Sequence, residues 1–135
     1  MAISPKHYIQ TTYQDMTYKQ TIRGKLPSKS NSYKIITLAG HGSLAKTKAL
    51  KAYEQAFYLQ CSLRGLGLKN LFKLTVDIYH ENMRPDLDNG FKVLLDCLQQ
   101  CKVIQNDRQC VEIHARKLVD KANPRIELEI EEINI

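Results

Sequence analysis

Alternation of apolar and polar positions is the clearest structural signal in this chain. Apolar residues occupy every second position from Phe72 to Ile78, and the positions between them carry Lys73, Thr75 and Asp77. A period of two is typical of a strand that buries one face and leaves the other in water. This segment is therefore predicted to be a strand of a half-buried sheet.

The same alternation recurs twice later in the chain, at residues 111–116 and 125–131. The inward positions are predicted to be Val111, Ile113 and Ala115 in the first segment and Ile126, Leu128 and Ile130 in the second. Because only a short turn at residues 121–124 joins them, we expect the two strands to pair as an antiparallel hairpin. Weaker patterns at residues 18–26 and 34–36 indicate two more strands.

Spacings of three and four residues predict two helices. The first is expected from an N-cap at Ser43 to about Arg64, and the second from about Leu87 to Cys101. Their inward faces carry Leu50, Tyr53, Phe57 and Cys61 in the first and Phe91, Leu94, Leu95 and Leu98 in the second. Residues 1–135 are thus predicted to form a single small α+β domain. Its mixed or antiparallel sheet of about four strands packs against two main helices, and residues 1–16 form a loosely ordered arm.

Composition places the chain among ordinary globular proteins. Hydrophobic residues make up 43% and charged residues 25%, and no apolar run approaches the ~20 residues of a membrane span. The start of the chain lacks the apolar core of a signal peptide. The four cysteines, at positions 61, 97, 101 and 110, form no CxxC pair, so reduced thiols in a cytoplasmic protein are expected.

Charge is distributed unevenly along the sequence. Residues 1–80 hold 12 Lys/Arg and 3 Asp/Glu, a net charge of +9, whereas residues 81–135 hold 8 and 11, a net charge of −3; together these give +6. A basic half favours contact with a polyanion such as nucleic acid. A merely soluble basic face would have the same composition, so the charge alone does not decide the function.

Three acidic residues stand out in the second half. Asp86 and Asp88 lie where the chain enters the second predicted helix, and Asp107 follows 19 residues after Asp88, beyond the end of that helix. Magnesium takes a few carboxylate oxygens and keeps positions open for water and for phosphate oxygens. If the chain returns so that Asp107 comes beside the other two, the set predicts a divalent-metal site for phosphodiester hydrolysis.

These residues also have a purely structural interpretation. Asp86 and Asp88 could stabilise the start of the helix, where acidic side chains interact with free N–H groups and with the helix dipole. Lys92 lies four residues from both Asp88 and Asp96, a spacing typical of ion pairs along a helix. The same lysine could instead reach a scissile phosphate.

The motifs resemble those of the RusA family of endodeoxyribonucleases, the Holliday junction resolvases of bacteria and prophages. Arg84–Asn89 is similar to the family's Arg/Lys-x-Asp-x-Asp-Asn signature, and Lys92 falls at its helix lysine. Asn106–Val111 resembles its Asp-Asp-x-Gln-Val segment, and Lys117 lies where a late lysine often occurs. Upstream, Leu26–Tyr33 is similar to its Pro-Pro-Ser-x-Asn-x-x-Tyr loop.

Two positions depart from the family pattern, and Lys29-Ser30-Asn31 is offset from its simpler loop. Asn106 replaces the first acid of the usual pair, and Gly90 replaces a more usual apolar residue. The acid at position 107 is retained, so the set of three carboxylates survives the comparison.

The resemblance implies a homodimer that binds a four-way DNA junction and nicks two opposing strands symmetrically, in DNA recombination and repair. It implies that Asp86, Asp88 and Asp107 bind Mg²⁺, for which Mn²⁺ can substitute, and that Lys92 stabilises the charge that develops on the phosphate. No organic cofactor and no membrane are expected. The candidate DNA contacts are Lys29, Lys34, His41, Arg84 and Lys117, the first three near the branch point.

Three other functions stay open on the sequence alone. One is a nuclease that cuts branched DNA with broader selectivity, which cleavage of flaps or forks would identify. Another is a protein that binds DNA junctions without cutting them, which metal-independent binding without product would identify. The last is a structural prophage protein with a coincidental acidic motif, whose DNA affinity would not exceed a salt-sensitive background.

Overall fold

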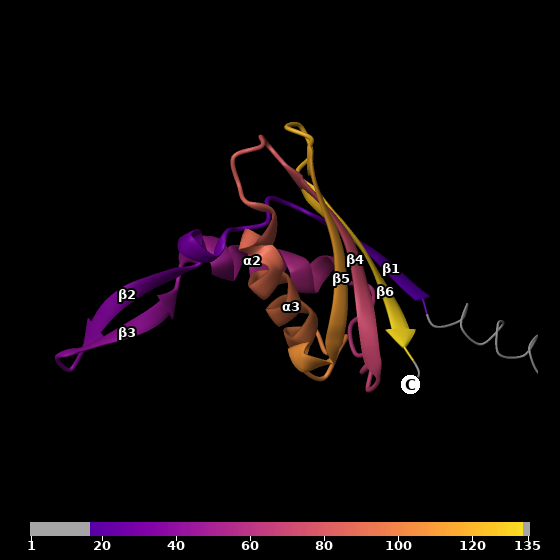
Figure 1. Cartoon of the computed structure of the whole chain (residues 1–135). Helices are drawn as coiled ribbons and strands as arrows, with labels where there is room; N and C mark the ends of the chain where they lie inside the picture. Colours follow the sequence, from indigo (N-terminus) through magenta and orange to yellow (C-terminus); the bar gives the residue numbers. More distant parts are fainter. Residues whose placement is uncertain (1–16, 134–135) are drawn as a thin grey trace, which may run out of the picture.

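The computed structural model describes residues 17–133, in which two helices lie on the same side of a mixed sheet (Figure 1). The sheet contains β1 (Thr17–Arg23), β4 (Leu71–His80), β5 (Cys110–Val119) and β6 (Arg125–Ile133), in the order β1-β6-β4-β5. The helices are α2 (Lys48–Gln60) and α3 (Phe91–Gln100). This architecture confirms the predicted α+β class. The loosely ordered arm predicted for residues 1–16 lies outside the described residues.

Smaller elements complete the fold. Strands β2 (Tyr33–Leu38) and β3 (His41–Lys46) form a separate two-stranded sheet, and the 3-10 helices are η1 (Lys29–Asn31), η2 (Leu87–Gly90) and η3 (Asp107–Gln109). Among the described residues, no helix is long and apolar enough to cross a membrane.

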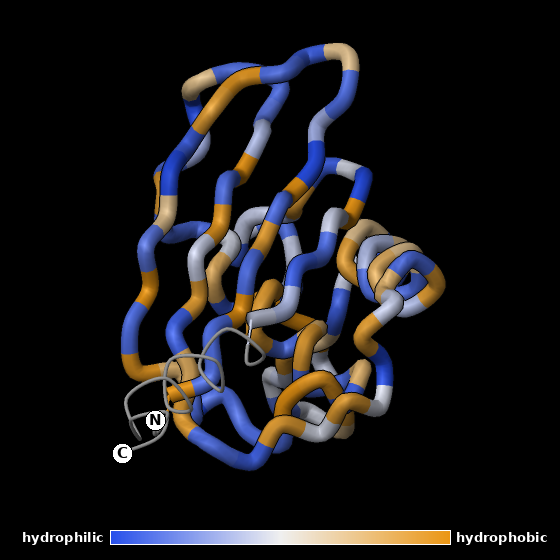
Figure 2. The backbone as a smooth tube through the Cα atoms, turned by 90° about the vertical axis from the view of Figure 1, so that its right-hand side faces the viewer, coloured by the Kyte–Doolittle hydropathy of each residue, from blue (hydrophilic) through white to orange (hydrophobic). Residues whose placement is uncertain are grey.

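The hydrophobic core lies between the sheet and the helices. The inward positions predicted for β4, β6 and α2 are confirmed as buried: Phe72, Leu74, Val76, Ile78, Ile126, Leu128, Ile130, Leu50, Tyr53, Phe57 and Cys61. Figure 2 shows the corresponding alternation of hydrophobic and hydrophilic positions along the strands. In α3 the predicted Leu94 and Leu98 are buried together with Val93 and Cys97, whereas Phe91 and Leu95 lie only partly buried at the margin of the core.

The predicted pairing of the last two strands is wrong. β4 lies between β5 and β6, and it pairs in parallel with the first and antiparallel with the second. The connection after β5 therefore crosses the end of β4, where the N–H of Asp120 donates to the carbonyl of His80 at 2.9 Å. A short turn does not force its flanking strands to pair when a more completely buried strand can pair with both of them.

The predicted inward position of Val111 is also wrong, because this side chain is 53% exposed. Phe72 pairs with Cys110 and Lys73 pairs with Glu112, so Val111 is the extra residue of a bulge. A bulge residue has no partner in the ladder, and the alternation of faces restarts after it. Ile113 and Ala115 accordingly resume the inward side of β5.

The first predicted helix begins too early and ends too late. Residues 41–46 pair with residues 33–38 as a hairpin, through a two-residue turn in which Ala39 and Gly40 have φ of 51° and 82°. Turns with two positive φ values match the twist of hairpin strands. The N-cap is Thr47 rather than Ser43, and its Oγ1 accepts from the N–H of Leu50 at 3.2 Å.

The hairpin projects from the body of the molecule, as Figure 1 shows. Ile35 and Leu44 face each other in its register, and they are 79% and 71% exposed. Its base is fixed by Thr47, whose Oγ1 donates to the carbonyl of Asn31 at 2.8 Å and whose N–H donates to the carbonyl of Ser32 at 3.0 Å. We call residues 29–46 the basic hairpin, since they include Lys29, Lys34 and Lys46 and no acidic residue.

Candidate active site

The acidic segment, residues 84–89, follows the loop that leaves β4. Asp86 is the extended residue before η2, with φ −70° and ψ 149°, and its side chain makes no capping hydrogen bond. Asp88 lies in the first turn of η2, and both side chains are exposed. Within residues 17–133, no hydrogen bond or ion pair involves either carboxylate. Helix capping therefore does not account for Asp86.

Lys117 holds the backbone immediately before Asp86. Its Nζ donates to the carbonyls of Met83 and Pro85 at 3.0 and 2.8 Å. Sequence reasoning proposed Lys117 as a DNA contact and missed this role. The sequence did contain a sign of this role. Lys117 lies on the inward side of β5, opposite Ile78, and a lysine is rarely buried unless its ammonium has partners.

Lys92 in α3 and Arg84 in the acidic segment differ in their contacts. Lys92 forms an exposed ion pair with Asp96 at 3.3 Å, as one of the two predicted i,i+4 pairs. The other, with Asp88, is not formed in the described structure. Arg84 donates its backbone N–H to Asn82 Oδ1 at 2.9 Å, and its guanidinium makes no contact of this kind within residues 17–133.

Asp107 is the first residue of η3, and its neighbours fix the turn. Asn106 is the N-cap and forms a capping box with Gln109, which explains how an asparagine serves at this position. The amide of Gln109 also donates to the carbonyls of Leu68 and Asn70 at 2.7 and 2.9 Å. The carboxylate of Asp107 makes no hydrogen bond or ion pair with the residues described, so it too is available.

One copy of the chain does not gather the three acids. Asp86 and Asp88 precede α3, whereas the backbone N–H of Asp107 donates to Gln99 Oε1, in the last turn of that helix, at 3.1 Å. The two sites lie toward opposite ends of α3 (Figure 1), and a helix of this length spans about 15 Å. Accordingly, the described part of the chain contains no group of three or more potential metal ligands. The three-carboxylate metal site stays a prediction.

A cleft of about 810 Å³ adjoins the acidic segment. Its lining residues come from the segment before η1, from α2, from the end of β4 and from the loop into η2: Lys25, Leu26, Pro27, Ser28, Asn31, Ala49, His80, Glu81, Asn82, Arg84, Pro85, Asn89 and Gly90. Gly90 is required there, because a Cβ on it would lie 2.3 Å from Leu26 Cδ2. This close packing explains the glycine that departs from the family pattern.

His80 is the most buried polar residue of the cleft. It is 6% exposed, and its Nδ1 has no hydrogen-bond partner within the described residues. Burial, together with the positive charges of Lys117 and Lys25, lowers the pKa of His80 below its usual range. The imidazole is therefore neutral near pH 7, with one nitrogen that donates and one that accepts.

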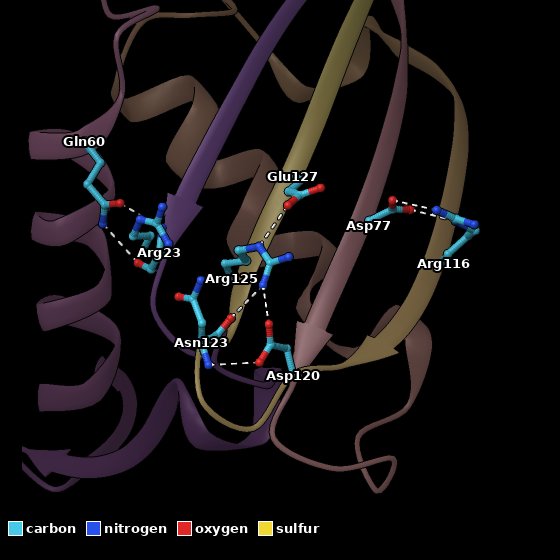
Figure 3. A network of polar contacts seen from close by, with 8 residues as sticks. All are labelled: Arg23, Gln60, Asp77, Arg116, Asp120, Asn123, Arg125 and Glu127. Carbon is cyan, nitrogen blue, oxygen red and sulfur yellow. Dashed lines mark hydrogen bonds and ion pairs between the residues drawn. The ribbon is translucent and has the colours of Figure 1, made fainter.

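Positive charge is concentrated beside the cleft. Residues 24–51, which include the basic hairpin, contain six lysines and no acid, and only Lys25 and Lys46 of these form ion pairs within the described structure, with Glu81 and Glu54. Lys29 lies in η1, Lys34 in β2 and His41 at the start of β3. The outer face of the sheet instead carries paired charges (Figure 3), such as Asp77 with Arg116 at 2.7 Å. The net charge therefore favours the basic hairpin as the polyanion-facing side.

Comparison with known proteins gives one match to a family model. Residues 6–131 match the model described as endodeoxyribonuclease RusA. The match spans the acidic segment, Asp107 and the basic hairpin. A search of curated proteins finds no match.

Proposed function

Since the chain belongs to the RusA family of endodeoxyribonucleases, we propose that it resolves four-way DNA junctions by nicking two opposing strands in a Mg²⁺-dependent reaction. The observation that carries the proposal is a set of carboxylates with no partner among the described residues, at Asp86, Asp88 and Asp107, in a chain whose residues 24–51 contain six lysines and no acid. Unpaired acids next to a phosphate-binding surface are unfavourable unless a cation joins them.

The chemistry of these residues fits a divalent cation. Asp86 and Asp88 offer hard oxygen ligands that are exposed and not neutralised by any described cation. When bound, the ion supplies Lewis acidity toward the phosphate and lowers the pKa of a bound water. Lys117 fixes the backbone at Pro85, so the carboxylate of Asp86 is presented from a held position.

A second copy of the chain would supply the missing ligand. Asp107 lies at the far end of α3 from Asp86 and Asp88. The three carboxylates would therefore come together if Asp107 is supplied by the partner. A two-fold dimer would contain two such shared sites, one for each of the opposing strands of a junction.

The free edge of β5 fits this arrangement. β5 is the last strand of the sheet, so its outer edge has no neighbour among the described strands. Asp107 lies just before its first residue, and Lys117, which holds the loop before Asp86, lies near its end. Antiparallel pairing of two β5 edges would place the start of each strand beside the end of the other. Asp107 of one copy would then approach Asp86 of its partner.

Lys92 would act on the phosphate. It lies in the first turn of α3, four residues after Asp88, and its ion pair with Asp96 is exposed. Exposed pairs of this kind contribute about 0–1 kcal/mol, so the ammonium can turn toward a phosphate at little cost. There it would stabilise the developing negative charge.

The basic hairpin would bind the DNA of the junction. Lys29 and Lys34 carry positive charge along the projecting element, and Ile35 and Leu44 expose apolar surface between the charges. Lysines bind backbone phosphates without regard to sequence. Apolar side chains can pack against bases that are unstacked, as they are at a branch point.

The test compares an immobile four-way junction with a linear duplex of the same sequences, in Mg²⁺ or in EDTA. The proposal predicts paired symmetric nicks in the junction with Mg²⁺, none in EDTA, and no cutting of the duplex. Equal cutting of flaps and forks would replace the proposal with a branched-DNA nuclease of broader selectivity. Junction binding without product would show a binder that does not cut.

A further inference from the structure

The cleft beside the acidic segment has no role in the proposed reaction, although it shares that segment's backbone. Pro85 and Asn89, which flank the two acids in sequence, both line it. Under the proposed function, a DNA strand bound at Asp86 and Asp88 would therefore lie next to the cleft. A neighbouring nucleotide of that strand is the group placed to enter.

The size and lining of the cleft suit an organic ring with polar edges. Its volume of about 810 Å³ lies within the range of about 300–1,000 Å³ that is common for small-molecule sites. Leu26, Pro27 and Ala49 supply apolar surface, while Asn82 and Asn89 supply amide donors and acceptors. Nucleobases removed from a stack are bound by this combination of apolar contact and edge hydrogen bonds.

Among the described residues, the charged groups that line the cleft include one cation without an ion-pair partner. Lys25 is neutralised by Glu81, with Nζ and Oε1 2.9 Å apart. Arg84 lines the cleft, and its guanidinium makes no ion pair or hydrogen bond with the described residues. Such an unpaired guanidinium can form charge-assisted hydrogen bonds with the phosphate of a nucleotide that enters the cleft.

His80 supplies a second, independent sign of a ligand. A buried nitrogen without a hydrogen bond costs about 1–3 kcal/mol. His80 Nδ1 has no hydrogen-bond partner within residues 17–133, and the residue is 6% exposed and lines the cleft. A polar ligand in the cleft would offer the imidazole the partner that it lacks.

We infer that this cleft receives one unstacked nucleotide of the bound strand, with its base against Leu26 and Ala49, a base edge on His80 and its phosphate on Arg84. Unstacking costs least where pairing is already interrupted, as at a junction branch point. The cleft would then select the nucleotide beside which the strand is cut. This inference rests on the proposed function and adds a specificity-determining site to it.

The test uses junctions with the fluorescent base 2-aminopurine at single positions around the branch, in EDTA so that no strand is cut. Binding is expected to raise the fluorescence at one position, because the base leaves the stack, and to protect that base from quenching by acrylamide. The variant Ala49→Leu narrows the cleft from an exposed position on α2. It is expected to keep junction affinity and to lose the protection.

Two further variants complete the design. Ala52→Leu makes the same change at an exposed position of α2 that does not line the cleft, and it should behave as wild type. His80→Asn keeps a polar group, and it is expected to reduce the preference among cutting positions in Mg²⁺ by about tenfold, the range of one good base contact.

The outcomes separate the inference from the proposed function. A junction that binds with no unstacked, protected base overturns the inference and leaves junction binding intact. Protection that persists in Ala49→Leu places the base elsewhere and overturns it as well. If the wild-type protein does not bind the junction at all, the proposed function fails first and takes the inference with it.

Discussion

The outer face of the sheet and the acidic segment contain the same kinds of side chains in opposite states. On the sheet, the guanidinium of Arg125 donates to Asp120 and Glu127 at 2.8 Å each and lies 3.8 Å from the ring centre of Tyr79. Figure 3 shows this network near the paired Asp77 and Arg116. In the acidic segment, by contrast, the carboxylates have no described partner.

The pairing on the sheet shifts the pKa of two carboxyl groups. Hydrogen bonds from Arg116 lower the pKa of Asp77, and those from Arg125 lower the pKa of Asp120. These charges are therefore already paired within the fold. The charges of the sheet are thus paired with each other within the fold, whereas the carboxylates of the acidic segment have no partner among the described residues and are available to the proposed cation.

Removing one unpaired carboxylate should change activity more than any of the other substitutions below. Asp88→Asn should lower junction cleavage by about a hundredfold to a thousandfold or more, because it removes a carboxylate ligand of the proposed cation, which would stabilise the negative charge developing on the phosphate. Junction binding in EDTA should be unchanged or slightly tighter, since a negative charge near phosphate is lost. The paired control is Asp77→Asn, which should lower stability and leave cleavage intact. Unfolding of Asp88→Asn would instead show that this acid stabilises the helix start.

The next effect concerns the basic hairpin. Replacing Lys29 and Lys34 together with alanine should reduce the slope of log affinity against log salt by about 1.8, because each phosphate contact contributes about 0.9. The matched control replaces Lys19 and Lys73, which lie on the mixed-charge sheet face. Affinities measured over a range of salt concentrations decide the matter. Equal slopes for both double variants would show that the hairpin does not grip DNA.

Packing beneath the acidic segment gives a stability effect. Gly90→Ala should cost about 1–3 kcal/mol, because the new Cβ overlaps the Leu26 side chain. In urea unfolding, adding Leu26→Ala should make the double variant more stable than the sum of the single changes predicts. Gly42→Ala, whose Cβ meets only Ile35 at an ordinary 3.8 Å, is the control and should change stability by less than about 0.5 kcal/mol. Strict additivity of Gly90 and Leu26 would disprove the contact.

The smallest effect is a pH dependence from His80. Its pKa is lowered in the folded state, so the unfolded chain binds more protons as the pH falls below about 6.5. The contribution to stability is therefore complete above about pH 6.5 and is lost toward the folded pKa, with a slope of at most about 1.4 kcal/mol per pH unit. Urea unfolding at several pH values should show this slope in wild type and a flatter profile in His80→Asn. Identical profiles would contradict a buried neutral histidine.

The sequence was informative about burial and about chemistry, and much less about which segments meet. Alternation correctly predicted the buried faces of β4 and β6, because a period of two depends only on which side faces the core. The partners of a strand are not encoded in that period, so β4 was not expected between β5 and β6. The basic hairpin was missed because residues 41–46 have no alternating apolar face, and their strand state depends on the turn at Ala39 and Gly40.

In the candidate site, too, the sequence indicated the residue types but not the contacts between distant segments. The acidic residues could be chosen from residue type and spacing, whereas the clamp by Lys117 and the packing of Leu26 against Gly90 depend on contacts between segments distant in sequence. The distance of Asp107 from Asp86 along α3 could not be read from spacing either, since the same spacing allows the chain to return to either end of the helix.

A site shared between two copies of the chain can be tested by mixing two inactive variants, Asp88→Asn and Asp107→Asn. If each site combines Asp86 and Asp88 of one copy with Asp107 of the other, a mixed dimer contains one intact site and one site with both defects. Co-expression should therefore restore Mg²⁺-dependent nicking of one junction strand, without paired nicks, while each variant alone stays inactive. Mixed dimers that are verified by mass and remain inactive would contradict the shared site.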